Sequence, residues 1–207
     1  MSRYFSASGV VLGRSFAGEG DILMTLFLKG VGLTFASARG ASSGKVRFGG
    51  GTEPLVWGTF SFYEGSAGRK SLTGVDVADD MLKMRARPDS LMAAVRWAKL
   101  VVRHLPPGHQ ADDLLANLYW NMRLLDEGFP PLAAEWRFLW RWLRLWGLAP
   151  DASEFADTPL ERGVLQAAAL SKVDGLMASG PDFSPMIGHA ELFRQASRRA
   201  EFLLRET

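Results

Sequence analysis

The spacing of hydrophobic and polar positions changes once along the chain, near residue 80. Before that point, short apolar stretches alternate with glycine-rich segments, a pattern typical of strands and turns. The expected strands cover residues 6–16, 22–28, 33–39, 55–63 and 70–77. Five short strands with glycine-rich turns predict a small barrel or sandwich.

After residue 80 the apolar positions follow the period of a helix. The expected helices cover residues 87–105, 111–126, 132–146, 158–178 and 190–204, and proline or glycine separates most of them. The fourth begins with a capping box, Thr158-Pro159-Leu160-Glu161. The sequence therefore predicts an α+β protein with a five-stranded domain over residues 1–80 and an all-helical domain over residues 81–207.

The composition is that of an ordinary globular protein, with 47% hydrophobic and 22% charged residues. Because there is no cysteine, disulfides, thiolate zinc sites and cysteine nucleophiles are excluded. No apolar run approaches the length of a membrane helix, and the N-terminus has no long apolar segment of the signal-peptide kind. We expect a soluble, cytoplasmic protein.

Motifs that would indicate covalent chemistry are missing. Residues 40–45 resemble a phosphate-binding loop, but Arg39 stands where glycine is needed and Val46 where Ser or Thr is needed. None of the three histidines has a partner at zinc-site spacing, and the adjacent carboxylates diverge from one another. We expect no catalytic residue, no cofactor and no metal, and therefore no enzyme.

Positive charge gathers in the N-terminal part, where residues 1–75 hold eight Lys or Arg against four Asp or Glu. Unpaired nucleic acid needs cations for its phosphates and flat side chains for its bases. The candidate DNA-binding cations are Arg14, Lys29, Arg39, Lys45, Arg47, Arg69 and Lys70, and the candidate stacking aromatics are Phe48 and Trp57.

A structural interpretation of the same residues stays open. Trp57 also fits the core of the barrel, and each cation taken alone fits a solvated surface. We assign Phe35, Phe60 and Phe62 to the core.

Residues 136–146 combine arginine with tryptophan on one predicted helix. Arg137, Arg141 and Arg144 form a stripe at i, i+4 and i+7, and Trp140 belongs to a neighbouring apolar face. In one interpretation this is a central helix whose arginines pair with carboxylates. In the other it receives an acidic peptide, with arginine binding carboxylates and tryptophan lining an apolar pocket.

Several segments, taken in order, resemble the RecO family of bacterial recombination mediators. The segment from Gly18 to Leu23 is similar to the family's first hairpin, and Ala38-Arg39-Gly40-Ala41 to the stretch before its basic loop. Glu53-Pro54-Leu55 resembles the entry to its next strand, and the helix closed by Gly147 and the segment Glu191–Arg194 resemble its central and closing helices.

The resemblance implies an N-terminal barrel of the OB type followed by a helical domain. It also implies binding of single- and double-stranded DNA and annealing of complementary strands. Its implied partners are RecR and the acidic C-terminal tail of single-strand binding protein, in loading RecA. Many relatives carry a four-cysteine zinc element after the central helix, but residues 151–157 here contain no cysteine. We expect a zinc-free, shortened member.

Three functional hypotheses remain open from the sequence, and the third is an unrecognised hydrolase, which would need a pocket with convergent polar groups. The first is a DNA-repair mediator whose barrel binds DNA and whose helical domain binds a tail peptide. The second is an adaptor whose barrel binds other proteins and never DNA.

Overall fold

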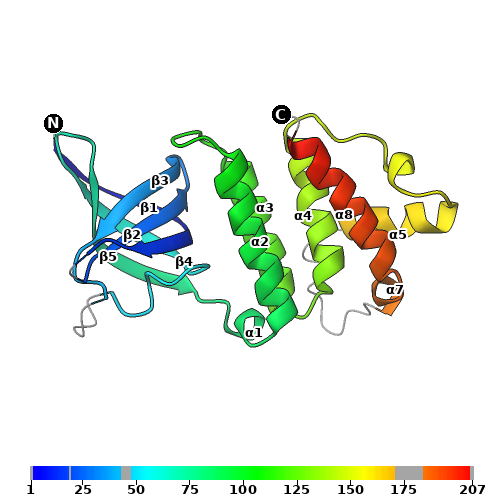
Figure 1. Cartoon of the computed structure of the whole chain (residues 1–207), viewed down its shortest axis with the longest axis horizontal. Coiled ribbons are helices and arrows are strands. Elements are labelled where there is room, and N and C mark those ends of the chain that lie inside the picture. Colours follow the sequence, from blue (N-terminus) through cyan, green and yellow to red (C-terminus); the bar gives the residue numbers. More distant parts are fainter. Residues whose placement is uncertain (1, 19, 43–47, 171–183, 206–207) are drawn as a thin grey trace. The chain divides into compact units, whose positions relative to one another are not determined.

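The computed structural model of the chain describes residues 2–18, 20–42, 48–170 and 184–205. The strands are β1 (Arg3–Phe16), β2 (Ile22–Leu28), β3 (Gly32–Ala38), β4 (Trp57–Glu64) and β5 (Lys70–Asp79). They close into a barrel in the order β1-β2-β3-β5-β4 (Figure 1). All neighbours are antiparallel except β3 and β5, which run parallel and pair at Ser37 and Ser71. The predicted five-stranded N-terminal sheet is confirmed.

Among the strand boundaries that differ from the prediction, the starts of β1 and β4 differ for local reasons. β1 begins at Arg3 because it pairs with β4 as far as Glu64. β4 begins only at Trp57, since Leu55 has a φ of 68°, in the left-handed region that strands do not use. The amide of Leu55 nevertheless donates to the carbonyl of Val11 at 2.7 Å, which joins this segment to the barrel.

The barrel interior is filled by side chains that alternate along each strand. Met24, Leu26, Phe60 and Phe62 are fully buried in this cluster. β3 contributes only small side chains, among them Ala36 and Ala38. The large aromatic rings therefore enter from β4.

The helices are α1 (Leu82–Arg85), α2 (Pro88–His104), α3 (Asp112–Asp126), α4 (Pro131–Leu145), α5 (Pro159–Leu170), α7 (Ser184–Ile187) and α8 (Ala190–Arg205), with a 3-10 turn, η1 (Ala152–Phe155), between α4 and α5. The five predicted helices correspond to α2, α3, α4, α5 and α8. The predicted end of the fourth, at residue 178, lies outside the described residues.

The chain divides into two compact units. The first, Met1–Met81 with Ala98–Leu115, is called the barrel unit here, and the second, Leu82–Trp97 with Ala116–Thr207, the helical unit. Residues 98–115 thus belong with the barrel, although the sequence pattern assigns them to the helical domain. Their attachment is specific: the amide of Gly108 donates to the carbonyl of Leu33, and the amide of Gly30 to the carboxylate of Asp112, both at 2.8 Å.

The core of the helical unit forms around α4, which packs against α5 and α8. The Trp97 ring stacks on Phe138 with centroids 5.1 Å apart. Arg96 joins two carboxylates on different helices, Glu135 on α4 at 2.9 Å and Glu201 on α8. Burial raises the pKa of Glu135, because the ionised carboxylate is poorly solvated there.

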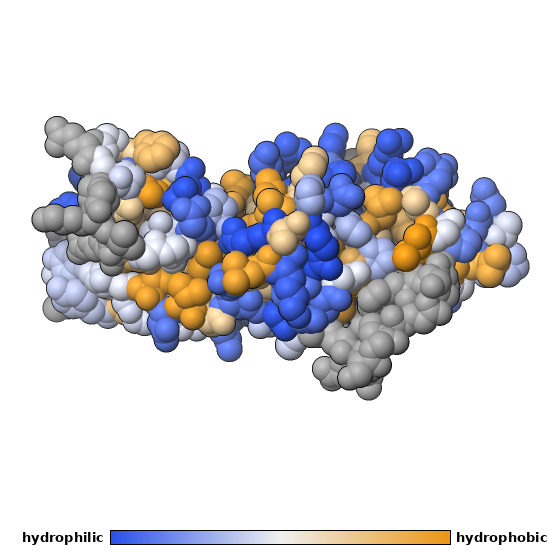
Figure 2. All heavy atoms as spheres, turned by 90° about the horizontal axis from the view of Figure 1, so that it is seen from below, coloured by the Kyte–Doolittle hydropathy of each residue, from blue (hydrophilic) through white to orange (hydrophobic). Residues whose placement is uncertain are grey.

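Within the part of the chain that the structure describes, no helix has the length and apolar character needed to cross a membrane. Apolar side chains are nevertheless visible between polar ones on the surface in Figure 2. Two of these exposed apolar positions in the barrel unit, Leu23 and Phe35, help to form the candidate site.

Candidate nucleic-acid interface

A shallow groove crosses the outer face of β2 and β3. The strand register puts Leu23 opposite Ser37 and Thr25 opposite Phe35, and these four side chains point away from the barrel interior. Phe35 is 46% exposed and Leu23 is 42% exposed. The assignment of Phe35 to the core is therefore wrong. The interior side of β3 is occupied by the small residues that alternate with it.

The turn between β4 and β5 brings positive charge to this groove. Because β3 and β5 run parallel and pair at Ser37 and Ser71, Arg69 lies level with Phe35 along the strand direction. Arg69 and Lys70 line the groove together with Phe35, and its volume is about 590 Å³. An exposed ring beside a cation is the combination that binds a stacked base and its phosphate.

The far wall of the groove comes from the segment after α2. Pro107 and Gly108 line the groove, and Gly108 is held to β3 by its hydrogen bond to Leu33. Gly32 makes this approach possible, because a Cβ at that position would overlap the carbonyl group of His109. The groove thus depends on residues that the sequence pattern assigns to the other domain.

Two predicted cations lie in ion pairs, so neighbouring carboxylates offset their positive charge. Lys70 lies 3.2 Å from the carboxylate of Glu64, which Arg3 also contacts at 2.7 Å. Hydrogen bonds from Arg3 and then Lys70 lower the pKa of Glu64, so this carboxylate stays ionised at neutral pH. Arg14 pairs with Glu53 at 2.7 Å.

The other predicted cations lie apart from one another. Lys29 and Arg39 are both exposed, but Lys29 follows β2 at one end of the β2–β3 hairpin and Arg39 follows β3 at the other end. A ligand that contacts only one end of the hairpin therefore does not reach both cations. Lys45 and Arg47 lie outside the described residues. The groove therefore brings together two of the seven predicted cations, Arg69 and Lys70.

Of the two predicted stacking residues, Trp57 is buried and Phe48 is half-buried. Trp57 is only 7% exposed, because β4 turns it toward the interior of the protein. Phe48 is half-buried and packs against the barrel core. The assignment of Trp57 to stacking is therefore wrong, that of Phe48 stays a prediction, and Phe35 takes an exposed position.

A second exposed ring that the sequence analysis did not select is Phe16, at the end of β1. It is 80% exposed, because the strand extends past the barrel core toward the tip of the β1–β2 hairpin. An aromatic residue just before a glycine-containing hairpin tip was the available signal. Phe35 offered a similar signal, because the positions that alternate with it along the strand include the small residues Ala36 and Ala38.

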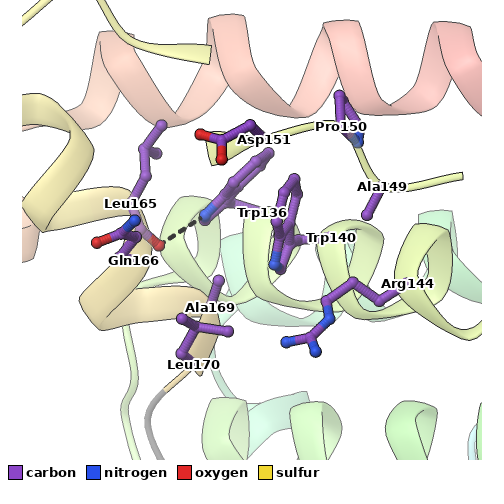
Figure 3. A pocket seen from close by; sticks show the side chains of 10 residues that line it. All are labelled: Trp136, Trp140, Arg144, Ala149, Pro150, Asp151, Leu165, Gln166, Ala169 and Leu170. Carbon is purple, nitrogen blue, oxygen red and sulfur yellow. Dashed lines mark hydrogen bonds between the residues drawn. The ribbon is translucent and has the colours of Figure 1, made fainter. Parts of the chain in front are cut away.

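The helical unit contains a separate pocket of about 410 Å³ beside α4. Its floor is formed by Trp136 and Trp140, and Arg144 and Asp151 lie on opposite sides of these rings (Figure 3). The indole N–H of Trp136 donates to the carbonyl of Leu165 at 2.9 Å. That of Trp140 is buried without a hydrogen-bond partner among the described residues.

The arginine stripe divides into buried and accessible members. Arg137 is fully buried and donates to the carbonyl of Ala169 at 2.9 Å, and Arg141 donates to the same carbonyl at 3.0 Å. Burial, and secondarily the charge of Arg141, lower the pKa of Arg137 to about 9. Its assignment to a peptide site is corrected, because its guanidinium is enclosed at the end of α5. Arg144 and Trp140 do line the pocket.

Among the described residues, no three His, Cys, Asp or Glu side chains gather as they would around a metal ion. The geometry described here is that of binding surfaces: a groove with a ring and two cations, and a tryptophan pocket with one arginine.

Known proteins are similar to this chain in sequence. A family model described as "Recombination protein O N terminal" matches residues 1–81, which contain all five strands. The protein named "DNA repair protein RecO" from Anaeromyxobacter sp. (strain K) is 33% identical over 161 residues, covering 75% of this chain and 63% of that protein. The protein of the same name from Gloeobacter violaceus is 41% identical over 110 residues, covering 53% of this chain and 42% of its own length.

The chain thus matches less than two thirds of the length of these relatives. The matches nevertheless agree in family, and the family model covers the barrel strands that form the groove. The chain belongs to the RecO family.

Proposed function

We propose that the chain is a non-enzymatic mediator of DNA repair and recombination. Its barrel, of the OB type, binds single-stranded DNA in the β2–β3 groove. Support comes from the names of its relatives, "DNA repair protein RecO", and from the five-stranded closed barrel with its parallel β3–β5 closure. In OB folds the face of strands 2 and 3 binds oligonucleotides. A cytoplasmic location accompanies this proposal.

The observation that carries the proposal is the exposed Phe35 ring level with Arg69 in a groove about 590 Å³ in volume. A base stacks on Phe35 and the neighbouring phosphate lies toward Arg69 and Lys70. Base stacking contributes about 1–3 kcal/mol per base and does not depend on sequence. Each neutralised phosphate adds about 0.7 to the slope of log affinity against log salt on single strands.

The test is a titration of a labelled single-stranded oligonucleotide at several salt concentrations. F35S is expected to weaken binding at least fivefold without changing the salt slope, because stacking is not ionic. R69A is expected to lower the slope by about 0.7. F202S is the matched control, since Phe202 on α8 is 57% exposed but lies in the helical unit.

Loss of affinity in F202S equal to that in F35S would contradict the groove assignment. No binding by the unmodified chain at low salt would favour the protein-only adaptor instead.

The pocket of the helical unit supports a second part of the proposal, binding of an acidic peptide that ends in an apolar residue. The tail of single-strand binding protein is the partner we propose for it. Trp136 and Trp140 offer an apolar floor, and Arg144 offers a cation for a carboxylate. The carboxylate of Asp151, on the other side of the pocket, repels the acidic residues of the peptide. The acidic part of the peptide therefore lies toward Arg144.

The peptide hypothesis is tested by titrating a short peptide ending in acidic residues and phenylalanine. R144E is expected to abolish binding, and R198E, an exposed position on α8, is expected to leave it unchanged. Equal loss in both variants would show only a dependence on net charge. Annealing of complementary strands, binding of double-stranded DNA, cooperation with RecR and loading of RecA complete the proposal and are each open to direct assay.

A further inference from the structure

The groove opens onto an edge of β3 as well as onto its outer face. The run Leu33–Ser37 lines the groove without a gap, although Thr34 and Ala36 are buried. A surface on one face of a strand would meet only every second side chain, because successive side chains point to opposite faces. The groove therefore also reaches the main chain of β3, on the side that faces β5.

The pairing of β3 with its neighbours decides which main-chain groups lie at this edge. The carbonyl of Leu33 accepts the amide of Gly108 on the side away from β2, and Ser37 pairs with β5 on that same side. In an antiparallel pair such as β2–β3, every second residue turns its N–H and C=O away from the partner strand. Phe35 lies two residues from both Leu33 and Ser37, so its N–H and C=O also face β5.

The β3–β5 ladder stops short of Phe35. Among the described residues its register holds one pair, near the end of β3. One more step would bond the N–H and C=O of Phe35 to Gly68 and Lys70. The chain turns toward β4 instead, where the carbonyl of Arg69 accepts the amide of Gly65 at 3.0 Å. Phe35 therefore offers the groove one donor and one acceptor, with no hydrogen-bond partner for either among the described residues.

The opening at this edge is one residue long. On one side of it Gly108 is bonded to Leu33, and on the other side Ser37 is paired with β5. Leu33 and Ser37 are four residues apart, or about 13 Å along the strand. An extended peptide adds to a sheet edge through several consecutive residues, and the flanking positions here are already paired. A single base needs only an adjacent donor and acceptor, which each base carries on its Watson–Crick edge.

The charge around the opening fits a nucleotide. Arg69 is level with Phe35 and lines the groove together with Lys70. Glu64 offsets the charge of Lys70, but no Asp or Glu is among the described residues that line the groove. The phosphate that accompanies a base in the opening therefore lies near a cation and away from carboxylates.

We propose that the main-chain N–H and C=O of Phe35 hold one unpaired base of single-stranded DNA by its Watson–Crick edge. The inference rests on the proposed function and deepens it, because it assumes that single-stranded DNA occupies the groove. Phe35 then acts twice, since its ring stacks one base and its main chain hydrogen-bonds another. The contact selects single strands, because the same edge of each base is already paired in a duplex.

The experiment removes the hydrogen bonds of the bases while keeping their shape. Two probes of about eight nucleotides, within the range that one barrel can hold, are titrated at one low salt concentration. One is oligothymidylate, and the other carries difluorotoluene, a non-polar isostere of thymine, at every base. Because both probes have the same phosphates, the ratio of their affinities reports the bases alone. The unmodified chain is expected to bind oligothymidylate about tenfold more tightly, the effect of two hydrogen bonds.

Two variants separate the main chain of Phe35 from its ring. F35A removes the ring and keeps the N–H and C=O, so it should weaken both probes and leave the tenfold ratio unchanged. F35P also removes the N–H, and because this group faces away from β2, no β2–β3 hydrogen bond is lost. The ratio is expected to fall to about threefold in F35P, since one of the two hydrogen bonds is gone. F202A, on α8, is the control for loss of an exposed ring and should keep both affinities.

Nuclear magnetic resonance gives a readout that needs no variant. The amide proton of Phe35 in the unmodified chain is expected to move downfield when oligothymidylate binds and to stay in place when the isostere binds. Far-ultraviolet circular dichroism of F35A and F35P that matches the unmodified chain shows that the barrel is intact.

The outcomes separate this inference from the proposed function. Equal affinity of the unmodified chain for both probes overturns the inference and leaves the groove with stacking alone. A ratio that disappears in F35A, or stays at tenfold in F35P, also overturns it, because the discriminating contact is then not the main chain of Phe35. Failure of the unmodified chain to bind either probe overturns the proposed function and this inference together.

Discussion

Replacement of Gly32 by alanine is expected to detach the groove wall from the barrel. Gly32 has a φ of 82°, and an L-residue in this region costs about 1–2 kcal/mol. Its new Cβ would also overlap the carbonyl of His109, so residues 106–112 must move. That movement weakens the hydrogen bond from Gly108 to Leu33, worth about 0.5–1.5 kcal/mol. Together these effects predict a loss of roughly 2–3 kcal/mol.

Gly30 in the same turn provides the control. Its φ is 69°, but a Cβ there meets no atom within 4 Å, so G30A has the backbone strain without the collision. Its expected loss is about 1–2 kcal/mol. The difference between the two variants, on the order of 1 kcal/mol, therefore measures the contact with residues 106–112.

Urea unfolding followed by circular dichroism gives the loss of stability for each variant. Hydrogen exchange of the Gly108 amide reports the local bond directly, and should be faster in G32A than in G30A. G32A should also bind single-stranded DNA more weakly, because Pro107 and Gly108 line the groove. Equal urea midpoints together with equal exchange rates for G32A and G30A would refute this account of the wall.

Three further predictions concern other interactions. T158A removes the capping box of α5, in which the Thr158 hydroxyl accepts a hydrogen bond at 3.2 Å, and should lower stability by about 1 kcal/mol in urea unfolding. E64Q releases Lys70 and should tighten DNA binding in the titration. Since the pKa of Glu64 is lowered on folding, the stability that it contributes is present above its ordinary pKa and is lost as pH falls, so E64Q and the unmodified chain should converge in acid. R137M removes a buried charge at the cost of one hydrogen bond to Ala169, and should raise the unfolding free energy by roughly 1–3 kcal/mol. That gain should shrink above pH 9, because the Arg137 guanidinium with its lowered pKa then loses its proton in the folded chain.

The order of strands and helices could be predicted because each element carries its own periodicity. β2 was predicted with the bounds Ile22–Leu28, and the helix with the capping box begins where Thr158 indicates. It was harder to predict which side of β3 faces the barrel interior, because both sides of this strand hold apolar residues. Only the pairing with β2 and β5 shows that Ala36 faces the interior and Phe35 the solvent.

The candidate site was only partly predictable, because it depends on contacts between distant residues. Arg69 and Lys70 were selected from the sequence and do line the groove, but nothing local indicated that Gly108 would form its wall. Helical periodicity likewise gave Arg137 and Arg144 the same stripe. The two differ in burial: Arg137 is fully buried and donates to the carbonyl of Ala169, whereas Arg144 is exposed and lines the pocket.

The balance of charge in the barrel unit decides which force dominates binding. Lys70 is paired with Glu64 and Arg14 with Glu53, so Arg69 is the groove's least compensated cation of those the sequence predicted. With so few cations among the described residues of the groove, stacking on exposed rings is expected to supply a large share of the affinity, at about 1–3 kcal/mol per base. The salt slope should then be shallow, near the value for one or two phosphates at about 0.7 each. A slope several times steeper would mean that most phosphates are neutralised by cations beyond the groove, and charge rather than the Phe35 ring would be the principal source of binding.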